Sequence, residues 1–505
     1  MTTPVTLTPV RPAATATPYP RRWYTLIVLC LSLLVIVVDG TIVNVALPTF
    51  ARDLHAGTTA LQWIVDAYTL TFAALLLLAG AIADRYGRDH ALTAGLAVFG
   101  AGSLVAAFTG TTTELIAARV LMGVGGAFIM PATLSILMNV FTNPVERTKA
   151  IGLWSAVSGL GVAIGPVTGG WLLAHFSWGS IFLVNLPIVA IALVAGHWLV
   201  PASRAPGAGA GHRLDLLGAL LSVAAFTTLT YTIIEAPDNG WLSGTTLGLA
   251  GATASLFALF IWREARAAHP MLPLRLFRNP RFTGAAVTLT ILFFALSGAV
   301  FMSTQIYQFV LGFSPLAAGV RALPAAAALA VFSPLGANIS KRAGVAVPVA
   351  LGLCMIAAGL TFFGTATAAS GYGHYVIAMV TMSAGIGLAM AAATTASMQV
   401  LPPALAGVGS AINDSTRNMG SVLGVAVFGS ISASIFASRM TAAHMSVSSV
   451  GAAAIAARQT GNADLLHTAA NAFVSGADHA VIAGIIAGVA GALIAVRTFR
   501  TRRPA

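Results

Sequence analysis

Long apolar runs, interrupted by short polar stretches, recur along almost the whole chain. We distinguish fourteen of them, and each is long enough to cross a hydrocarbon layer ~30 Å thick as an α-helix. This pattern predicts an all-α polytopic membrane protein. The segments are approximately 23–48, 60–82, 91–110, 113–140, 148–174, 180–200, 214–236, 244–262, 282–310, 316–338, 345–366, 374–400, 407–436 and 477–497.

Composition agrees with the pattern and excludes several classes of protein. Hydrophobic residues make up 57% of the 505 residues, charged residues 8%, and the mean hydropathy is +0.88, so no sizeable soluble domain is expected. Both cysteines, Cys30 and Cys354, lie in apolar runs, which argues against a disulfide framework or a cysteine-based metal site. We find no phosphate-cradling loop, His/Glu metal motif or nucleophile elbow. We therefore expect neither an enzyme, nor ATP-driven pumping, nor a cofactor.

The distribution of Lys and Arg predicts the topology. The net charge is +12, but the basic residues lie at the ends of apolar segments and form no single patch, so nucleic acid is not an expected partner. With a cytoplasmic N-terminus, twenty of the 26 Lys and Arg residues fall on the inner side, and only Arg52, Arg439 and Arg458 fall in outer loops. We expect a multi-pass protein of the cytoplasmic (inner) cell membrane with both termini cytoplasmic.

Three segments outside the spans have distinct compositions. Residues 1–22 are rich in Thr, Pro and Ala and read as a disordered cytoplasmic lead-in, not a cleavable signal. Residues 498–505 form a basic cytoplasmic tail. The outer segment 437–476 is rich in Ala, Ser and Thr, and we expect a solvated loop there. A metal site at its scattered histidines is the weaker alternative, because no ligand spacing supports it.

A repeat divides the chain into halves. The stretch Gly80–Arg88 closes the second apolar segment, and Gly336–Gly344 closes the tenth with a similar pattern of glycine followed by basic residues. Two six-helix halves, 23–200 and 282–497, with two inserted helices within 201–281, account for this spacing. Halves of this kind build alternating-access transporters with a substrate site near the middle of the membrane.

A carboxylate, Asp39, lies deep in the first apolar segment, about 22 Å along the helix from its interfacial Trp23 and Tyr24. An aspartate at the centre of a membrane helix costs roughly 2.5 to 3.5 kcal/mol, so Asp39 should face a water-filled cavity or a partner. The alternative is a carboxylate that snorkels or stays protonated in a helix contact. Intramembrane acids are functional by default, which favours the first reading.

Other charged residues lie at comparable depths. Arg119 is about eight residues from the outer end of the fourth segment, a depth similar to that of Asp39, so the two predict a buried ion pair. Asp66, near the outer end of the second segment, is expected to line the outer mouth of the cavity, whereas Glu235 reads as interfacial. Acids outnumber bases around this cavity, which favours organic cations as substrates.

Nine short motifs occur in a fixed order along the chain: Asp39–Pro48, Trp63–Tyr68, Gly80–Arg88, Leu115–Gly126, Gly161–Gly170, Val184–Pro187, Leu214–Gly218, Ser314–Gly319 and Asn413–Gly420. In this order they resemble the motifs of the major facilitator superfamily, and together with the fourteen spans they resemble its drug:proton antiporter branch. The resemblance covers nearly the whole chain. Asp89 stands where the family usually has a basic residue, and Trp178-Gly179-Ser180 replaces a commoner Trp-Arg-aromatic run.

The resemblance and the residue chemistry together predict four groups of functional residues. Proton coupling is expected at Asp39, Arg119 and Asp66. A cytoplasmic gate, or alternatively a plain positive-inside anchor, is expected at Gly80, Asp84, Arg85, Gly87 and Arg88. An antiporter motif, which is at least a close-packing helix face, is expected at Gly161, Gly165, Pro166, Gly169 and Gly170. The candidate substrate cavity has Asn44, Trp154, Tyr307, Asn413 and Arg417, for which ordinary packing is the alternative.

The sequence therefore predicts a proton-coupled antiporter that exports hydrophobic or cationic drugs, antibiotics or secreted metabolites by alternating access. Its partners would be the small-molecule substrate, protons and the lipid bilayer, with the proton gradient as energy source and a monomer as the functional unit. A nutrient, ion or metabolite facilitator or symporter on the same fold is the alternative. A membrane enzyme or sensor is a third hypothesis, and the missing catalytic cluster argues against it.

Overall fold

A computed structural model describes residues 19–203, 215–267, 272–401, 406–445, 447 and 449–499. In these ranges fourteen helical segments are long and apolar enough to cross a membrane, which confirms the predicted number of spans and the all-α class. The elements are α1 (Arg22–Asp53), α2 (Thr58–Tyr86), α3 (Arg88–Ala107), α4 (Thr112–Val140), α5 (Pro144–His175), α6 (Ser180–Leu183), α7 (Asn185–Leu199), α8 (Leu216–Asn239), α9 (Gly244–Arg266), η1 (Leu274–Arg278), α10 (Pro280–Gln305), η2 (Ile306–Val310), α11 (Pro315–Arg321), α12 (Leu323–Ala343), α13 (Ala346–Phe363), α14 (Tyr372–Gln399), α15 (Ala406–Ala442), α16 (Val450–Thr460) and α17 (Ala463–Phe499).

Short polar signals start and separate these apolar helices. Thr111 and Glu114 form a reciprocal capping box at the start of α4. Asn143 caps α5 and Asn279 caps α10, each followed by a proline at the first helical position, where the missing N–H has no partner to lose. Gly87, with φ at +123°, ends α2 and starts α3 in a single residue, which a side chain would strain.

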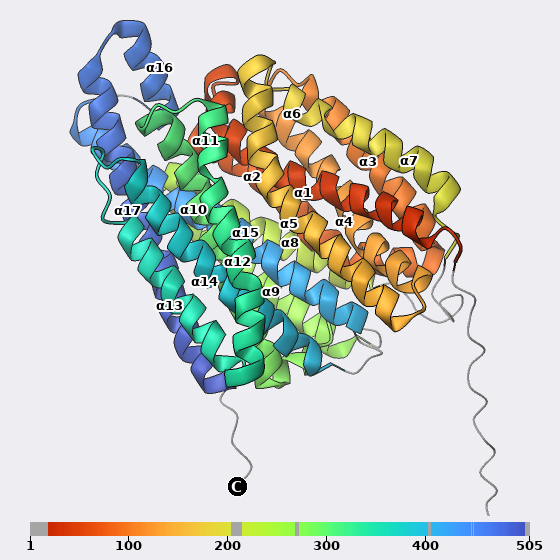
Figure 1. Ribbon diagram of the computed structural model, residues 1–505. Helices are drawn as coiled ribbons and strands as arrows, with labels where there is room; N and C mark the ends of the chain where they lie inside the picture. Colours follow the sequence, from red (N-terminus) through yellow and green to blue (C-terminus); the bar gives the residue numbers. More distant parts are fainter. Residues whose placement is uncertain are drawn as a thin grey trace, which may run out of the picture.

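The helices pack in two groups. Helices α1 to α7 contact mainly one another, and so do α10 and α12 to α17, whereas α11 lies mainly on α5. Helix α8 pairs with α9 and packs on α2 and α15. Figure 1 shows the first group in red to yellow and the second in green to blue, side by side. The hydrogen bond from Trp63 Nε1 to Glu235 Oε1, at 3.2 Å, ties α8 to α2. The inserted pair thus lies beside the line where the two groups meet.

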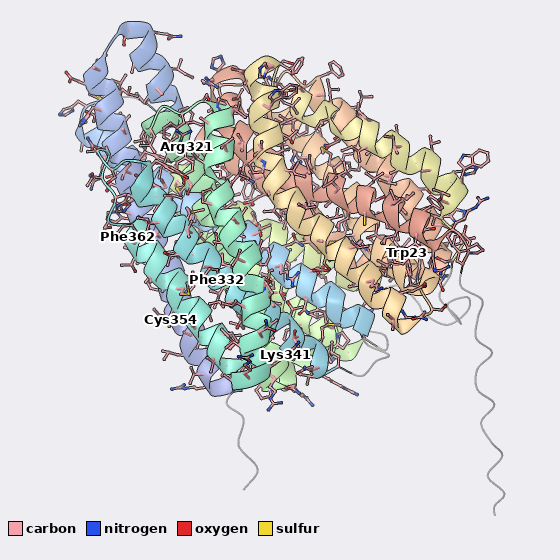
Figure 2. The ribbon with its side chains drawn as sticks, viewed as in Figure 1. Trp23, Arg321, Phe332, Lys341, Cys354 and Phe362 are labelled. Atoms are coloured by element: carbon pink, nitrogen blue, oxygen red, sulfur yellow. The ribbon has the colours of Figure 1, made fainter. Side chains whose placement is uncertain are left out.

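The two ends of the bundle differ in charge and in covering. Figure 1 shows α16 at one end, which we call the α16 end. The opposite end carries Arg85, Arg88, Lys341 and Arg342 at the termini of α2, α3 and α12, and we call it the basic end. Figure 2 shows Arg321 at the α16 end and Lys341 at the basic end of the same span.

The two groups are joined near the α16 end, and we call this contact region the seam. Gln62 Nε2 of α2 donates to the Ala426 carbonyl of α15 at 2.9 Å and to Ser430 Oγ at 3.2 Å. Gln308 Nε2 of η2 donates to the Val45 carbonyl of α1 at 2.8 Å. Both glutamines are fully or almost fully buried, so these bonds close the α16 end of the bundle.

The segment 437–476, expected to be a solvated loop, is largely helical. Helix α15 continues to Ala442, α16 occupies Val450–Thr460, and α17 begins at Ala463. Alanine has the highest helix propensity, and Ser449 caps α16 through a 3.2 Å bond from the Ala452 amide. The loop prediction was wrong because it weighed polarity and not propensity, and because the buried face of α16 packs on α1, η2 and α17.

Some predictions concern residues that the structure does not describe. The basic tail from residue 500, the lead-in before residue 19 and most of the linker at 204–214 lie outside the described ranges. The end of the expected lead-in is described, and it is ordered: Tyr19 Oη donates to the Leu199 carbonyl at 3.3 Å, and α1 begins at Arg22. The aromatic ring and its hydroxyl hold residues 19–22 against the end of α7, where composition had predicted a disordered lead-in up to residue 22.

Candidate functional site

The centre of the first helix group holds an ion pair between α1 and α4. Asp39 is fully buried, and Arg119, 1% exposed, donates to Asp39 Oδ2 through Nη1. Their predicted pairing is confirmed, and Asp39 faces this partner and not an open cavity. A buried ion pair is a weak source of stability because desolvation offsets its attraction, whereas loss of one partner leaves an uncompensated charge.

Arg119 is held by more than its carboxylate. Its Nε donates to the Ile64 carbonyl of α2 at 3.1 Å, and its guanidinium carbon lies 4.2 Å from the centre of the Tyr68 ring. The aromatic face and the carbonyl both favour a positive charge. These contacts can retain the guanidinium while the charge of Asp39 changes, which is what a protonation switch in this helix group requires.

Asn185, which the sequence offered only as part of the Val184–Pro187 motif and without a role, is a partner of Asp39. Its Nδ2 lies 3.3 Å from Asp39 Oδ1 and donates to Ser103 Oγ of α3 at 2.9 Å, and all three side chains are buried. The amide thus holds the carboxylate oxygen that Arg119 does not contact. An asparagine at the start of an apolar helix was the available signal, but only packing reveals which way it points.

Helix α2 carries a second fully buried carboxylate, Asp66. Neither of its oxygens has a hydrogen-bond partner within the described residues. It lies one helical turn from Gln62 and one turn from Leu70, which pack against α15 through Ala426 and Met419 respectively. Asp66 is therefore on the seam face of α2. Asp66 is buried here because this end of the bundle is closed around it, and its expected place at the outer mouth of the cavity stays a prediction.

The glycines of α5 form two separate contact faces. Gly161 packs against Val37, Gly165 against Thr41, and Gly169 against Ile42, so this face lies on α1 directly beside Asp39. A Cβ atom at any of the three would overlap the α1 side chain. The packing reading of this motif is confirmed for the α1 face.

The other face of α5 crosses the seam. A Cβ atom on Gly170 would collide with the backbone of Leu316, and one on Gly319 of α11 would collide with the Pro166 carbonyl. Backbones of α5 and α11 are thus in direct contact at the α16 end. Helix α5 thus contacts α1 beside Asp39 with one face and α11 of the second helix group with the other.

At the basic end, the loop between α2 and α3 is held within the first helix group. Arg88 pairs with Asp84 at 2.8 Å and reaches the Ser135 carbonyl of α4 at 3.4 Å. Asp89, the departure from the family pattern, accepts a 3.2 Å bond from the Ser203 amide. Arg85 lies over the Tyr86 ring. These contacts hold the loop in place in this conformation, as both a gate and a positive-inside anchor require.

Comparisons with known proteins identify the family. A family model described as the Major Facilitator Superfamily matches residues 29–425. This chain belongs to that superfamily.

Among solved structures, a bacterial homologue of the human lysosomal transporter Spinster, in an inward-facing and unoccupied conformation, matches with a TM-score of 0.69 at 17% identity, covering 95% of this chain and 98% of that one. The nucleoside transporter NupG matches with a TM-score of 0.61 at 12% identity, covering 94% and 100%. The major facilitator fold is therefore confirmed.

Relatives that are 34 to 36% identical to this chain include drug and antibiotic resistance proteins. The multidrug efflux pump LfrA of Mycolicibacterium smegmatis is 34% identical over 501 residues, covering 96% of this chain and 98% of that one. The multidrug resistance protein Stp of Mycobacterium tuberculosis is 36% identical, covering 81% and 75%. The methyl viologen resistance protein SmvA of Salmonella typhimurium is 35% identical, covering 81% and 82%. This chain is a multi-pass membrane transporter and not an enzyme.

The five candidate cavity residues of this transporter lie at four places in the fold. Asn413 donates to Ser397 at 2.7 Å and Arg417 to Thr394 at 2.7 Å, so both join α15 to α14 in the second group. Asn44 of α1 bonds the carbonyl of Gly40, where an added Cβ would meet nothing, so this face of α1 borders open space. The structure does not bring these residues together with the remaining two.

Trp154 and Tyr307 lie apart from that face. Trp154 Nε1 on α5 is buried without a hydrogen-bond partner among the described residues. Tyr307 is in η2 at the α16 end, with ring centroids 5.9 Å from Tyr372 and 6.3 Å from Tyr375. The ordinary packing role fits Tyr307 in this conformation. In the described part of the chain no cluster of His, Cys, Asp and Glu could hold a metal ion.

Proposed function

We propose that this transporter is a proton-coupled antiporter that exports hydrophobic and cationic drugs, antibiotics or secreted metabolites across the cytoplasmic membrane. The observation that carries the proposal is the buried pair of Asp39 and Arg119, with Asn185 orienting the carboxylate. A titratable group that loses its partner on protonation is the simplest coupling device. The resistance functions named for relatives that are 34 to 36% identical support export as the direction.

Protonation of Asp39 would weaken its attraction to Arg119. The guanidinium would keep the Ile64 carbonyl and the Tyr68 ring, but its charge would be poorly compensated in a buried site. Movement of α1 relative to α4 relieves that penalty. The same movement changes how α1 lies on α5, because Val37 and Thr41 flank Asp39 and pack on the α5 glycines.

Helix α5 supplies the link to the seam. Its Gly161 and Gly165 lie on α1, and its Gly170 lies on the backbone of α11. Close-packed backbones move together and do not slide gradually, so a shift of α1 would be transmitted to the closed α16 end. The two helix groups, residues 23–200 and 282–497, would then rock about the seam, with the bond from Gln308 to Val45 broken in the outward-open state.

The basic end is assigned to the cytoplasm, with both termini there, on the asymmetry of Lys and Arg. The α16 end is then the outer end, and the described conformation is closed to the outside. The loop with Asp84 and Arg88 would act as the cytoplasmic gate, making these contacts in one state and exchanging them in the other. A monomer suffices for this cycle, because both helix groups belong to one chain.

Cationic substrates are favoured by the relatives and by charge. SmvA is named for resistance to methyl viologen, which is an organic dication. The open face of α1 at Gly40 and Asn44 offers a polar amide without a charge, and Asp39 lies one residue before Gly40. A cation that approaches this face would compete electrostatically with the proton on Asp39. Competition for one carboxylate gives exchange in its simplest form.

Transport by purified protein in proteoliposomes tests the proposal. We expect uphill methyl viologen movement to require an imposed pH gradient and to be abolished in Asp39→Asn, while Asp53→Asn, on an exposed carboxylate at the end of the same helix, should behave like the parent. Substrate addition to the detergent-purified parent in weak buffer should release protons. Equal transport with and without the gradient would replace the antiporter proposal by the facilitator alternative.

A further inference from the structure

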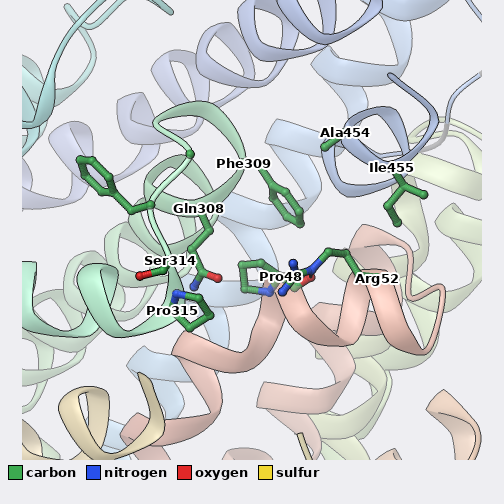
Figure 3. Close-up of a pocket in the computed structure, with 10 residues that line it drawn as sticks. Pro48, Arg52, Gln308, Phe309, Ser314, Pro315, Ala454 and Ile455 are labelled. Atoms are coloured by element: carbon green, nitrogen blue, oxygen red, sulfur yellow. Dashed lines mark hydrogen bonds between the residues drawn. The ribbon is translucent and has the colours of Figure 1, made fainter. Parts of the chain in front are cut away.

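A cavity of about 290 Å³ lies at the closed α16 end, outside the proton-coupling site. Its wall has parts from three places in the chain: Pro48 and Arg52 of α1, Gln308 and Phe309 of η2, and Ile455 of α16. Figure 3 shows Pro48 and Arg52 facing Gln308 and Phe309, with Ala454 and Ile455 beside them. Its volume is close to the lower end of the range for small-molecule pockets, about 300 Å³.

The lining combines apolar side chains with one cation, Arg52, and two neutral polar side chains, Gln308 and Ser314. Pro48, Phe309, Phe313, Pro315 and Ile455 supply rings and a branched side chain. Space remains beside Gly312, which has no side chain and a φ of +68°. A Cβ atom added to it would have no atom within 4 Å. Apolar walls with one charged group at the edge are typical of sites that orient an amphipathic ligand.

The cation in the wall is Arg52. Its Nε donates to the Pro48 carbonyl at 3.3 Å and one terminal nitrogen donates to Thr49 Oγ1 at 3.1 Å, both within its own helix. No ion pair joins it to a carboxylate anywhere in the described ranges. A guanidinium has five N–H donors, so an acidic group in the cavity can still be bound.

A second arginine adds to the positive charge of this region. The guanidinium carbon of Arg321 lies 4.0 Å from the centre of the Phe313 ring, which also lines the cavity, and Arg321 Nη1 donates to the Ala317 carbonyl. Like Arg52, it forms no carboxylate pair within the described part of the chain. Two such arginines at one apolar cavity favour an anion and oppose a cationic occupant.

We propose that this cavity binds an amphipathic organic anion, with its acidic group at Arg52 and its apolar body between Phe309, Phe313 and Ile455. The site spans both helix groups, since Gln308 reaches from η2 to the Val45 carbonyl of α1 at its edge. Occupancy therefore stabilises the closed seam. A ligand bound at the α16 end would therefore inhibit export. Only this consequence rests on the proposed function.

Equilibrium dialysis of the full-length protein in phosphatidylcholine nanodiscs with labelled 2-naphthoate tests the binding site directly. We expect saturable binding of one molecule per chain, at least about tenfold weaker for the neutral analogue 2-naphthylmethanol. Arg52→Gln should weaken 2-naphthoate binding about tenfold or more, because a charge-assisted bond is lost. Ile455→Trp should abolish binding by filling the cavity. Arg52→Lys should retain part of it, which separates lost charge from misfolding.

Arg439→Gln is the matched control, since Arg439 is an exposed cation at the same end that does not line this cavity. Phosphatidylglycerol in the nanodiscs distinguishes two sources of the same chemistry: competition with 2-naphthoate assigns a lipid headgroup, and no competition assigns a free organic anion. Equal binding of the neutral analogue, or unchanged binding in both Arg52→Gln and Ile455→Trp, would overturn the proposal. A failure of drug transport in proteoliposomes would leave the dialysis result standing.

Discussion

Asp39 of α1 and Arg119 of α4 form an ion pair in which the carboxylate is fully buried and the arginine is 1% exposed. The pair is surrounded by groups that suit each partner, the Asn185 amide for the carboxylate and the Tyr68 ring for the guanidinium. Two charges placed in this way contribute little net stability, so their presence is better explained by transport than by folding.

Replacement of either partner should therefore affect both folding and transport. Asp39→Asn should lower the free energy of unfolding by about 3 to 5 kcal/mol, because the Arg119 charge stays buried without a counter-charge. Gradient-driven efflux should fall to the level of empty vesicles, while substrate binding is retained. Arg119→Lys should keep part of the transport and Arg119→Ala none, because lysine keeps the positive charge but lacks the planar, multi-donor guanidinium group. Full uphill efflux by Asp39→Asn would shift the coupling role to Asp66.

Asp66→Asn should have the opposite effect on stability. Both oxygens of Asp66 lack partners within the described residues, so an ionised carboxylate there is desolvated without compensation. An amide of the same shape removes that penalty, and we expect the free energy of unfolding to rise by about 1 kcal/mol or more, seen as a higher thermal midpoint of the purified protein. Thermal unfolding in detergent measures this. A loss as large as that of Asp39→Asn would mean that Asp66 has a stabilising partner.

The seam contact of α5 with α11 can be tested with one methyl group. Gly170→Ala places a Cβ atom on the Leu316 backbone, so the α16 end should no longer close. We expect efflux to fall about tenfold and a cysteine at Asn44, on a background without Cys30 and Cys354, to react faster with an external thiol reagent. Gly152→Ala on the same helix is the control, because its Cβ meets nothing within 4 Å. Identical labelling rates in the two variants would contradict a closed seam at Gly170.

The loop at the basic end gives a prediction about turnover. Asp84 is 47% exposed and pairs with Arg88 four residues away, so this pair should contribute less than about 1 kcal/mol to stability. Asp84→Asn should leave expression near normal and lower the turnover number, if the pair is exchanged during the cycle. Substrate efflux per molecule of protein is the measurement. Unchanged turnover would return the loop to the anchor reading.

Membrane orientation remains a prediction from the basic residues, and it is directly testable. A cysteine or reporter placed within 204–212 should be accessible only from the cytoplasm, and one within 445–465 only from outside. Reaction with a membrane-impermeant reagent on intact cells and on inverted vesicles distinguishes the two sides. Exposure of either segment on the opposite side would invert the topology and the assignment of the α16 end to the exterior.

Periodicity and composition were sufficient for the number of spans and the all-α class, because length and hydrophobicity of a membrane helix are local properties of the chain. The family followed from the resemblance of the ordered motifs, which the family model confirms. The depth of Asp39 and Arg119 followed in the same way, since a helix rises by a constant amount per residue. Opposite charges at the same depth inside a bilayer pair with each other, because an unpaired charge there is costly. Their pairing was therefore predictable without knowledge of the packing.

Rotation of each helix about its axis and the state of the seam were decided only in three dimensions. Asn185 reaches Asp39, and Asp66 faces α15, because of how α7 and α2 are turned by packing along their whole length. Helix α16 was missed because its burial depends on Gly451 fitting against Ala51 and Phe309, two residues far from it in the chain. The cavity at Arg52 likewise exists only where α1, η2 and α16 converge, so no stretch of sequence could indicate it.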